Sequence, residues 1–185
     1  MKTYLLPSLK LTAILIIICA VIYPILIMII GKAAPGHGDG VTLRANGKII
    51  GYENVGQQFV SDDNFQGRPS AVDYNAAGSA GSNKGASNSK YLTLVKARID
   101  TFLIHNPGIK KSDIPADLIT ASGSGLDPDI SVQAAKVQVP RIAKVRKRNE
   151  KELYELLEKL TEHPLFGLGP EKINVLKLNI ELNKR

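Results

Sequence analysis

Two serines in a glycine-rich stretch are the first residues whose type and spacing could do chemistry. The stretch reads Ser122-Gly123-Ser124-Gly125, and a serine held in a sharp glycine turn can serve as a nucleophile. It lacks the G-x-S-x-G frame of a hydrolase, and none of the three histidines stands in a motif that ties a general base to it: His37, His105 and His163. We therefore predict no catalytic residue, and a membrane-tethered hydrolase built on either serine is the more remote alternative.

The glycine-rich run from Gly78 to Gly85 resembles a phosphate-binding loop at first sight. Such loops end in Gly-Lys-Ser or Gly-Lys-Thr, and here the ending is Asn83-Lys84-Gly85. The replacement removes both the turn glycine and the hydroxyl that would bind magnesium. We interpret this run as a surface loop.

Four aspartates lie close together in the sequence and could act as an acid and base pair or bind calcium: Asp113, Asp117, Asp127 and Asp129. In a G-L-D-P turn, however, aspartate more often accepts hydrogen bonds from its own backbone. The histidines show neither an H-x-x-x-H spacing nor a pairing with cysteine, so no zinc site is indicated. We predict no metal site.

An uncharged run at residues 11–31 is the element that would hold the rest of the chain at a membrane. These 21 residues would span roughly 31 Å as a helix, about the thickness of a bilayer core. We predict an N-terminal tail at 1–10, a transmembrane helix at 11–31 and one soluble domain at 33–185. A cleaved signal peptide is the competing interpretation, but its apolar region runs only about 7–15 residues.

Pro24 is the unusual residue inside this run, because its ring removes the hydrogen bond to the carbonyl of Ala20. That carbonyl would be left in lipid. A packed partner helix, a contact of Tyr23 or a local adjustment of the backbone could satisfy it. We expect a kink of the membrane anchor here.

Charge gives only a weak indication of orientation. The tail carries Lys2 and Lys10, and similar numbers of basic residues follow the run, so counting them gives nearly a tie. A short tail is easily kept inside while a long domain is translocated, so we expect the domain to face outward. The only cysteine, Cys19, lies within the run, which excludes a disulfide scaffold and thiol catalysis in the domain.

The domain is mildly basic. Of the net charge of +7, three lysines lie in the first 32 residues, which leaves 21 basic against 17 acidic residues. One dense cluster stands at the end of a predicted helix: Lys144, Arg146, Lys147 and Arg148. Such a cluster could touch lipid headgroups, but a solvated helix end is the simpler interpretation. Without interleaved aromatic residues, no nucleic acid is expected as a partner.

The first part of the domain is predicted to hold a hairpin, a long loop and a helix. Residues 41–45 and 48–59 flank Asn46-Gly47, which can take the positive φ values of a tight turn. Residues 61–90 contain few large apolar side chains, as expected for a loop or an interaction surface. A helix should follow and end at Pro107-Gly108, because apolar residues recur at helical spacing: Leu92, Val95, Ile99, Phe102 and Leu103.

The second part is predicted to alternate short strands and helices. We expect a strand near 118–121, then a helix capped by Ser131 that Pro140 interrupts and restarts. A helix capped by Asn149 should bury its leucines, and the alternating pattern at 176–182 predicts a strand. The fold class is therefore α+β, with one transmembrane helix followed by a domain of an antiparallel sheet and packed helices.

Four segments of the chain are distinctive together. They read FQGRPSAVDYNAAGSAGSNKGASN at 65–88, PADLITASGSGLDPDIS at 115–131, QVPRIAKVR at 138–146 and INVLKLNIEL at 173–182. In this order they resemble the C-subunit family of the Kdp-type potassium-transporting ATPase. The similarity runs from the anchor to the C-terminus. One departure is that Asp129 stands where the family usually has histidine.

The resemblance implies a single-pass protein of a bacterial inner or plasma membrane. Its partners would be a channel-like A subunit that carries potassium, a P-type B subunit that hydrolyses ATP, and the lipid bilayer. The chain itself would be a non-catalytic accessory subunit, stabilising assembly and modulating ATP use in the manner of a catalytic chaperone. No cofactor would be bound firmly, and ATP would be reached through the catalytic subunit. A direct ATP-binding regulatory subunit is the alternative.

The two glycine-rich and serine-rich segments are the signature of this resemblance. Glycines let a backbone approach a partner closely, and polar side chains form hydrogen bonds across an interface. We expect a docking surface there, although the same glycines could serve internal turns only. The candidate docking residues are Arg68, Asn75, Ser82, Asn83, Ser122, Gly123, Ser124, Gly125, Asp127 and Arg141.

Overall fold

The apolar N-terminal sequence forms a continuous helix in the computed structural model, which describes residues 2–164 and 167–184. Helix α1 (Lys2–Ile17) passes through a π-helical turn (Ile18–Ile22) into α2 (Tyr23–Ala33). Its 30 residues from Tyr4 to Ala33 are long and apolar enough to cross a membrane, and none of their side chains is buried by the rest of the chain. The predicted transmembrane segment at 11–31 lies within this helix.

The π-helical turn lies directly before Pro24. The backbone N–H of Tyr23 donates to the carbonyl of Ile18, five residues earlier, which is the hydrogen bond of a π-turn. Such a turn accommodates a proline by widening the helix locally. The backbone adjustment that we considered beside Pro24 is therefore present.

The chain divides into two compact units, Met1–Thr42 and Leu43–Arg185. A hairpin of β1 (Thr42–Ala45) and β2 (Lys48–Tyr52) stands at the start of the second. Asn46 and Gly47 have φ values of +50° and +76°, as a tight hairpin turn requires. The predicted hairpin is confirmed, although its second strand ends at Tyr52 and not at Phe59.

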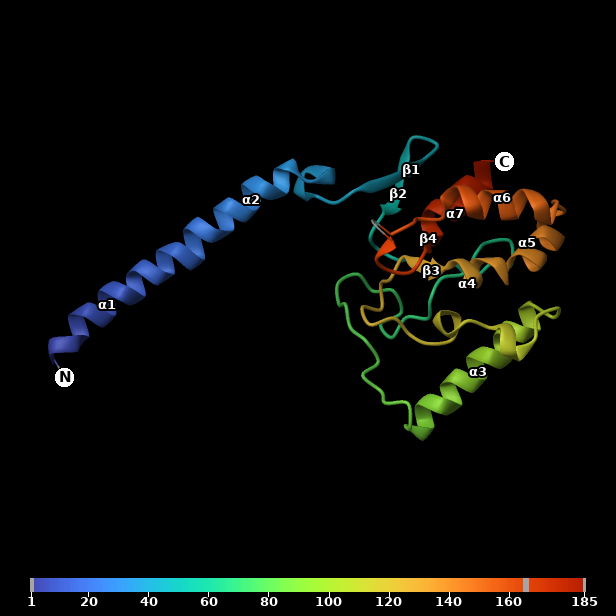
Figure 1. Ribbon diagram of the computed structural model, residues 1–185, viewed down its shortest axis with the longest axis horizontal. Helices are drawn as coiled ribbons and strands as arrows, with labels where there is room; N and C mark the ends of the chain where they lie inside the picture. Colours follow the sequence, from blue (N-terminus) through green and yellow to red (C-terminus); the bar gives the residue numbers. More distant parts are fainter. Residues whose placement is uncertain (1, 165–166, 185) are drawn as a thin grey trace. The chain divides into compact units, whose positions relative to one another are not determined.

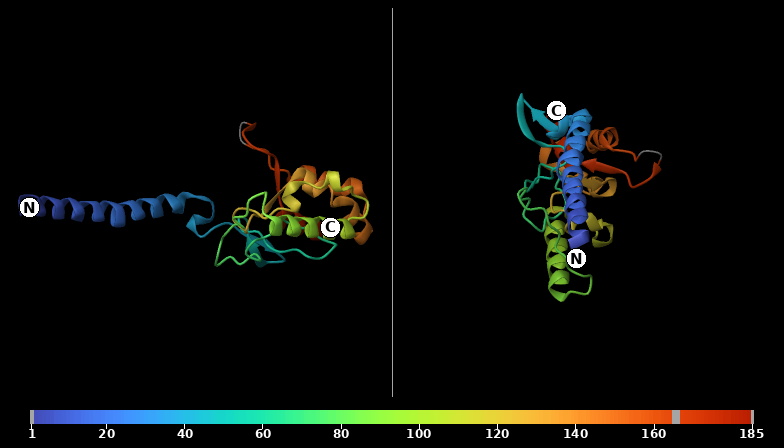
Figure 2. Two further views of the ribbon diagram at one scale, coloured as in Figure 1. Left: turned by 90° about the horizontal axis from the view of Figure 1, so that it is seen from below. Right: turned by 90° about the vertical axis from the view of Figure 1, so that its left-hand side faces the viewer.

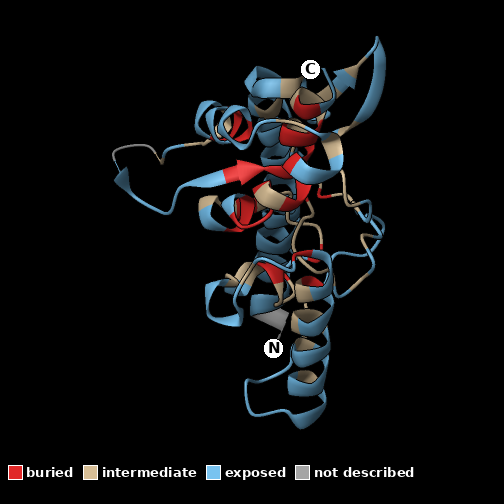
Figure 3. Cartoon of the chain, turned by 90° about the vertical axis from the view of Figure 1, so that its right-hand side faces the viewer, coloured by how far each residue is buried: buried red, intermediate tan, exposed pale blue. Residues whose placement is uncertain are grey.

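The core of the second unit forms around a short antiparallel pair of strands (Figure 1). In β3 (Asp129–Ser131) and β4 (Lys172–Asn174), Ile130 lies opposite Ile173, and both side chains are buried. Four helices surround the pair: α4 (Val132–Lys136), α5 (Val139–Arg146), α6 (Glu150–Leu160) and α7 (Val175–Lys184). Figure 3 shows buried residues concentrated in these elements. The α+β fold class is confirmed.

Polar caps and a proline set the helix boundaries here. The hydroxyl of Ser131 accepts from the N–H of Ala134 at 3.0 Å and begins α4. Pro140 lies in the first turn of α5, where its missing N–H costs nothing. The side chain of Asn149 accepts from the N–H of Lys151 at 2.9 Å and begins α6. The two caps and the restart at Pro140 are confirmed.

The strand predicted at 176–182 is wrong, because this segment is helix α7. Its buried residues are spaced as on one face of a helix: Val175, Leu176, Leu178, Asn179 and Leu182. The alternating pattern treated Asn179 as a surface residue. It is buried because its amide has a partner in the core, described below.

The strand predicted near 118–121 is also wrong. A 3₁₀ turn (Ala116–Leu118) occupies this place, and the N–H groups of Ile119 and Thr120 both donate back to the carbonyl of Ala116. These donors are used locally and are not free for a strand ladder. The segment therefore forms a turn.

Helix α3 (Ser89–His105) confirms the predicted helix, and Asn88 caps it. It lies at the edge of the second unit (Figure 1 and the right-hand view of Figure 2). Phe102 is its only fully buried residue, whereas Leu92 and Leu94 are 52% and 43% exposed. The loop predicted at 61–90 is confirmed up to Asn88, but its Phe65 is completely buried in the core, which its composition did not indicate.

Candidate functional site

The two signature segments, 65–88 and 122–128, pack against each other and are called the paired loops below. The hydroxyl of Ser70 donates to the carbonyl of Gly125 at 2.7 Å, and that of Ser79 donates to the carbonyl of Ser124 at 3.0 Å. The N–H of Ser122 donates to the carbonyl of Pro69 at 3.2 Å. The structure therefore brings together the segments that the resemblance marked.

An ion pair joins the paired loops. Arg68 Nη1 lies 2.9 Å from Asp127 Oδ2, and both side chains are about three-quarters buried. Asp127 Oδ1 also accepts from the N–H of Asp129 at 3.0 Å, the backbone role that we considered for an aspartate in this turn. The hydroxyl of Tyr74 donates to the carbonyl of Arg68. Burial, aided by the charge of Asp127, raises the pKa of Tyr74 to about 12.

The two serines with nucleophilic potential use their hydroxyls within the turn. Ser122 is buried, and its Oγ accepts from the N–H of Gly125 at 2.9 Å. Ser124 Oγ accepts from the N–H of Leu126 at 3.1 Å. The three histidine side chains contact other groups: Lys32 by His37, Asp62 by His105 and Glu171 by His163. The serines are thus turn-forming residues in this structure.

Close backbone approach explains two of the glycines. Gly125 has a φ of +70°, and a Cβ atom there would lie 2.6 Å from Val72 Cγ2 and 2.8 Å from the carbonyl oxygen of Ala80. A Cβ on Gly81 would lie 2.9 Å from the carbonyl oxygen of Gly123. These glycines allow the loops to touch each other, so the internal role that we considered for them is present.

The remaining aspartates form internal contacts. Asp117 accepts from the N–H of Ser131 at 2.7 Å, and Asp129 Oδ2 lies 2.5 Å from Lys172 Nζ. Asp113 accepts from the hydroxyl of Ser112. Within residues 2–164 and 167–184, no three histidine, cysteine or acidic side chains come together to hold a metal ion.

The Gly78–Gly85 run is an irregular loop before α3. Asn83 is exposed with a φ of +51°, and Ser82 is half-buried. The Asn75 side chain accepts from the N–H of Ala77 within an exposed turn. Together with the exposed Gly123 and Ser124, these are the candidate docking residues that lie at the surface.

Arg141 differs from the other candidate docking residues, because it lies in the interior and is only 6% exposed. Its Nε donates to Asn106 Oδ1 at 3.0 Å, and Nη2 donates to Gln138 Oε1 at 2.8 Å. Nη1 donates to the carbonyls of Asp62 and Asn64. Burial lowers the pKa of Arg141, against the opposing effect of Asp62. The guanidinium therefore ties the 62–64 chain to the core.

Two buried amides hold the first of the paired loops in place, and the sequence analysis missed both. Asn179 exchanges hydrogen bonds with the N–H and the carbonyl of Phe65, each 2.9 Å long. Gln138 does the same with Gln66, at 2.8 and 3.1 Å. Each amide replaces a missing backbone partner, which fixes a loop that composition alone would leave mobile. An amide within an apolar stripe of a helix was the available signal.

The basic cluster also has internal partners. Arg146 donates to the carbonyl of Asp63 at 2.5 Å and to Asn183 Oδ1 at 2.7 Å. Arg148 reaches the carbonyl of Leu182 at 3.4 Å. Arg146, at the end of α5, and Arg148, two residues later, therefore connect this end of α5 to the loop and to α7.

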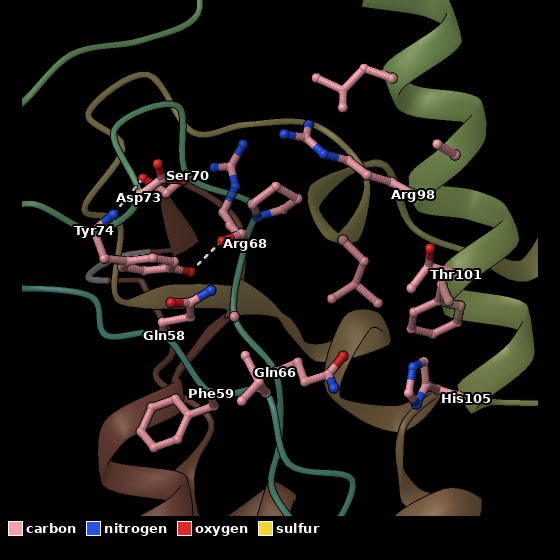
Figure 4. Close-up of a pocket in the computed structure, with 17 residues that line it drawn as sticks. Gln58, Phe59, Gln66, Arg68, Ser70, Asp73, Tyr74, Arg98, Thr101 and His105 are labelled. Atoms are coloured by element: carbon pink, nitrogen blue, oxygen red, sulfur yellow. Dashed lines mark hydrogen bonds between the residues drawn. The ribbon is translucent and has the colours of Figure 1, made fainter.

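A groove of about 460 Å³ runs between α3 and the first of the paired loops. Figure 4 shows its two walls, with Arg68, Ser70 and Tyr74 on one side and Arg98, Thr101 and His105 of α3 on the other. Its lining mixes polar groups with apolar side chains such as Phe59 and Leu94. Sequence reasoning had placed Arg68 at a docking surface but had not identified Arg98.

The comparisons with known proteins agree with the four matching segments. A family described as "KdpC: K+-transporting ATPase, c chain" matches residues 5–184. A relative from Flavobacterium johnsoniae named "Potassium-transporting ATPase KdpC subunit" is 55% identical over 176 residues, which cover 95% of each chain. Relatives of the same name from Bacteroides fragilis and Janthinobacterium sp. are 47% and 43% identical. The alignments cover all of this chain, and 98% and 100% of those relatives.

These matches extend over both the apolar helix and the paired loops, so they do not rest on one shared motif. The resemblance inferred from the residues is confirmed at the level of the family. The chain belongs to the KdpC family, the c chains of K+-transporting ATPases.

Proposed function

We propose that this chain is a non-catalytic accessory subunit of an ATP-driven potassium-uptake complex. The observation that carries the proposal is the helix Tyr4–Ala33, whose apolar side chains are left uncovered by the rest of the chain. The apolar side chains of such a helix need lipid or neighbouring helices around them. The names of the relatives, which are those of subunits of a potassium-transporting ATPase, support a place in such an assembly.

The proposed role is to stabilise the assembly of a channel-like A subunit with a P-type B subunit and to modulate ATP use by the latter. In support, the two candidate nucleophiles of the second unit accept hydrogen bonds from backbone amides. No histidine or carboxylate side chain among the described residues accepts a hydrogen bond from either hydroxyl, as a base that activates a nucleophile would. The chain would act by biasing a conformational equilibrium of the complex, as a catalytic chaperone does.

The proposal places the tail inside a bacterial inner or plasma membrane and the second unit outside. Cys19 is the only cysteine, so a Cys19→Ser background allows single cysteines to be placed at Ser87 or Lys151, both exposed. Both should react with an impermeant thiol reagent in intact spheroplasts, whereas a cysteine at Lys2 should react only after lysis. The reverse pattern would place the unit in the cytoplasm.

ATP is proposed to reach the complex through the catalytic subunit and not to bind this chain firmly. The Gly78–Gly85 loop lacks the lysine and hydroxyl arrangement of a phosphate loop, which supports this choice. Equilibrium binding of a labelled ATP analogue to the purified full chain in detergent tests it. Saturable binding at millimolar or lower concentration would favour the alternative, a direct ATP-binding regulatory subunit.

A further inference from the structure

The groove along α3 holds two arginines whose hydrogen-bonding capacity is incompletely used. Nη1 of Arg98 donates to the carbonyl of Ile119 at 3.2 Å, and no carboxylate in the described part of the chain pairs with this guanidinium. Arg68 pairs with Asp127 through Nη1, but its Nε is buried without an acceptor. This Nε is the only such buried side-chain atom among the described residues.

A buried donor without an acceptor is costly, because it has lost its water and gained nothing in return. Figure 4 shows the guanidinium groups of Arg68 and Arg98 entering the same part of the groove from opposite walls, one from the loop and one from α3. Because Arg68 Nε is closed to solvent, an anionic oxygen placed between the two side chains would accept from their Nη2 groups, which no hydrogen bond within the described part of the chain uses. Guanidinium groups are well suited to this, because their fork of donors matches a carboxylate.

Apolar side chains also line the groove, and some of them are exposed. Leu94 is 43% exposed and Val60 is 73% exposed, and both line it together with Phe59 and Pro69. A small free anion would leave these side chains in water. A polypeptide that presents an acidic residue beside an apolar one would cover them and pair the arginines at the same time.

The charge of the groove also limits its occupant. The carboxylate of Asp73 lines the wall beside Ser70, at the end away from Arg98 (Figure 4). A polyphosphate lying along the groove would meet this negative charge, whereas a single carboxylate at the arginine end would not. We propose that the groove between α3 and residues 66–74 docks an acidic segment of a partner subunit, with its carboxylate between Arg68 and Arg98. The proposal rests on the proposed function, since it needs a complex to join.

The test uses a charge reversal with a matched control on the same helix. Arg98→Glu places a negative charge in the groove, whereas Lys96→Glu makes the same change of net charge at an exposed residue outside the groove lining. Each full-length variant is titrated in detergent against the complex lacking this chain, and its melting temperature is measured. Arg98→Glu should weaken association about tenfold or more, and Lys96→Glu about twofold or less. Both should melt close to the unaltered chain.

A photoreactive residue provides a second measurement that does not depend on charge. Placed at Leu94, it should crosslink to another subunit, and placed at Lys96 it should not. The proposal fails if Arg98→Glu associates as tightly as the unaltered chain, or if Lys96→Glu weakens association equally. It also fails if inorganic phosphate binds the full chain through Arg98 while association is unaffected by that variant. If even the unaltered chain joins no partner, the proposed function fails first and the docking groove with it.

Discussion

The second unit has two halves that differ in how their polar side chains are paired. The first half lies around α4, α5 and α7, and the second half lies along α3. Around α4, α5 and α7, Arg141, Gln138 and Asn179 are buried, and their donors and acceptors meet groups of the same chain. Along α3, Arg98 lacks a carboxylate partner and Arg68 Nε lacks any acceptor among the described residues. In the first half, folding alone supplies partners for these buried polar groups. In the second half, donors without an acceptor and exposed leucines remain, as expected for a binding surface.

The largest effect should follow from Arg141→Ala, which tests whether the first half depends on its polar contacts. The change leaves Asn106 Oδ1 and the carbonyls of Asp62 and Asn64 without a donor. We expect a loss of about 3–5 kcal/mol in the free energy of unfolding. The melting temperature of the full chain in detergent should fall by roughly 10 °C, measured by circular dichroism.

The control for this variant is Lys144→Ala, an exposed residue of the same helix with no ion pair among the described residues. It should melt within about 2 °C of the unaltered chain. If Arg141→Ala were equally harmless, the guanidinium would be dispensable to folding. The prediction that Arg141 is a docking residue would then be favoured again.

The parts of the fold that local rules determine could be predicted from the sequence. The apolar run, the Asn46-Gly47 hairpin turn and the caps Ser131 and Asn149 each depend on neighbouring residues only, and each is confirmed. The error at 176–182 arose because alternation treats every polar residue as exposed. Asn179 is buried because Phe65, 114 residues earlier, offers it a backbone partner, and no local pattern contains that contact.

The sequence indicated which segments form the candidate site, but not which residues contact one another there. The resemblance marked both of the paired loops, and the structure brings them together through Arg68 and Asp127. Sequence alone could not distinguish Arg68, which faces a groove, from Arg141, which lies in the core. Arg98 was missed because a basic residue on an amphipathic helix is usually part of its solvated face.

A smaller effect is expected for Tyr74→Phe, which tests the boundary between the two halves. The variant loses the hydrogen bond from the hydroxyl to the carbonyl of Arg68, a cost of about 1 kcal/mol at neutral pH. The pKa of Tyr74 is about 12 in the folded chain, above its ordinary value of 10.0. The contribution of this tyrosine to the stability of the fold is therefore complete below pH 10. That contribution is lost as the pH rises from 10 toward 12.

The measurement is chemical unfolding of both proteins between pH 8 and pH 12, where ionisation of other groups affects them equally. The stability of the unaltered chain relative to Tyr74→Phe should fall across the upper part of this range, by up to roughly 1.4 kcal/mol per pH unit, so that its initial advantage of about 1 kcal/mol is lost and then reversed. A difference that stays constant would mean that Tyr74 ionises as easily in the folded chain as in the unfolded one. Tyr52→Phe, which removes an exposed hydroxyl, serves as the control.

The smallest effect on folding should come from Leu94→Ala in the second half, and this variant sharpens the comparison most. Both residues line the groove, but Leu94 is 43% exposed, whereas Phe102, two turns further along α3, is buried and belongs to the core. Leu94→Ala should change the free energy of unfolding by about 0.5 kcal/mol or less, while Phe102→Ala should cost about 3–5 kcal/mol. Association with the complex should show the opposite order when each variant is compared at a temperature where it is folded. A leucine that contributes little to its own fold and much to assembly would identify α3 as a docking element. If Leu94→Ala instead destabilised the isolated chain as Phe102→Ala does, the groove would be part of the core and the contrast between the two halves would disappear.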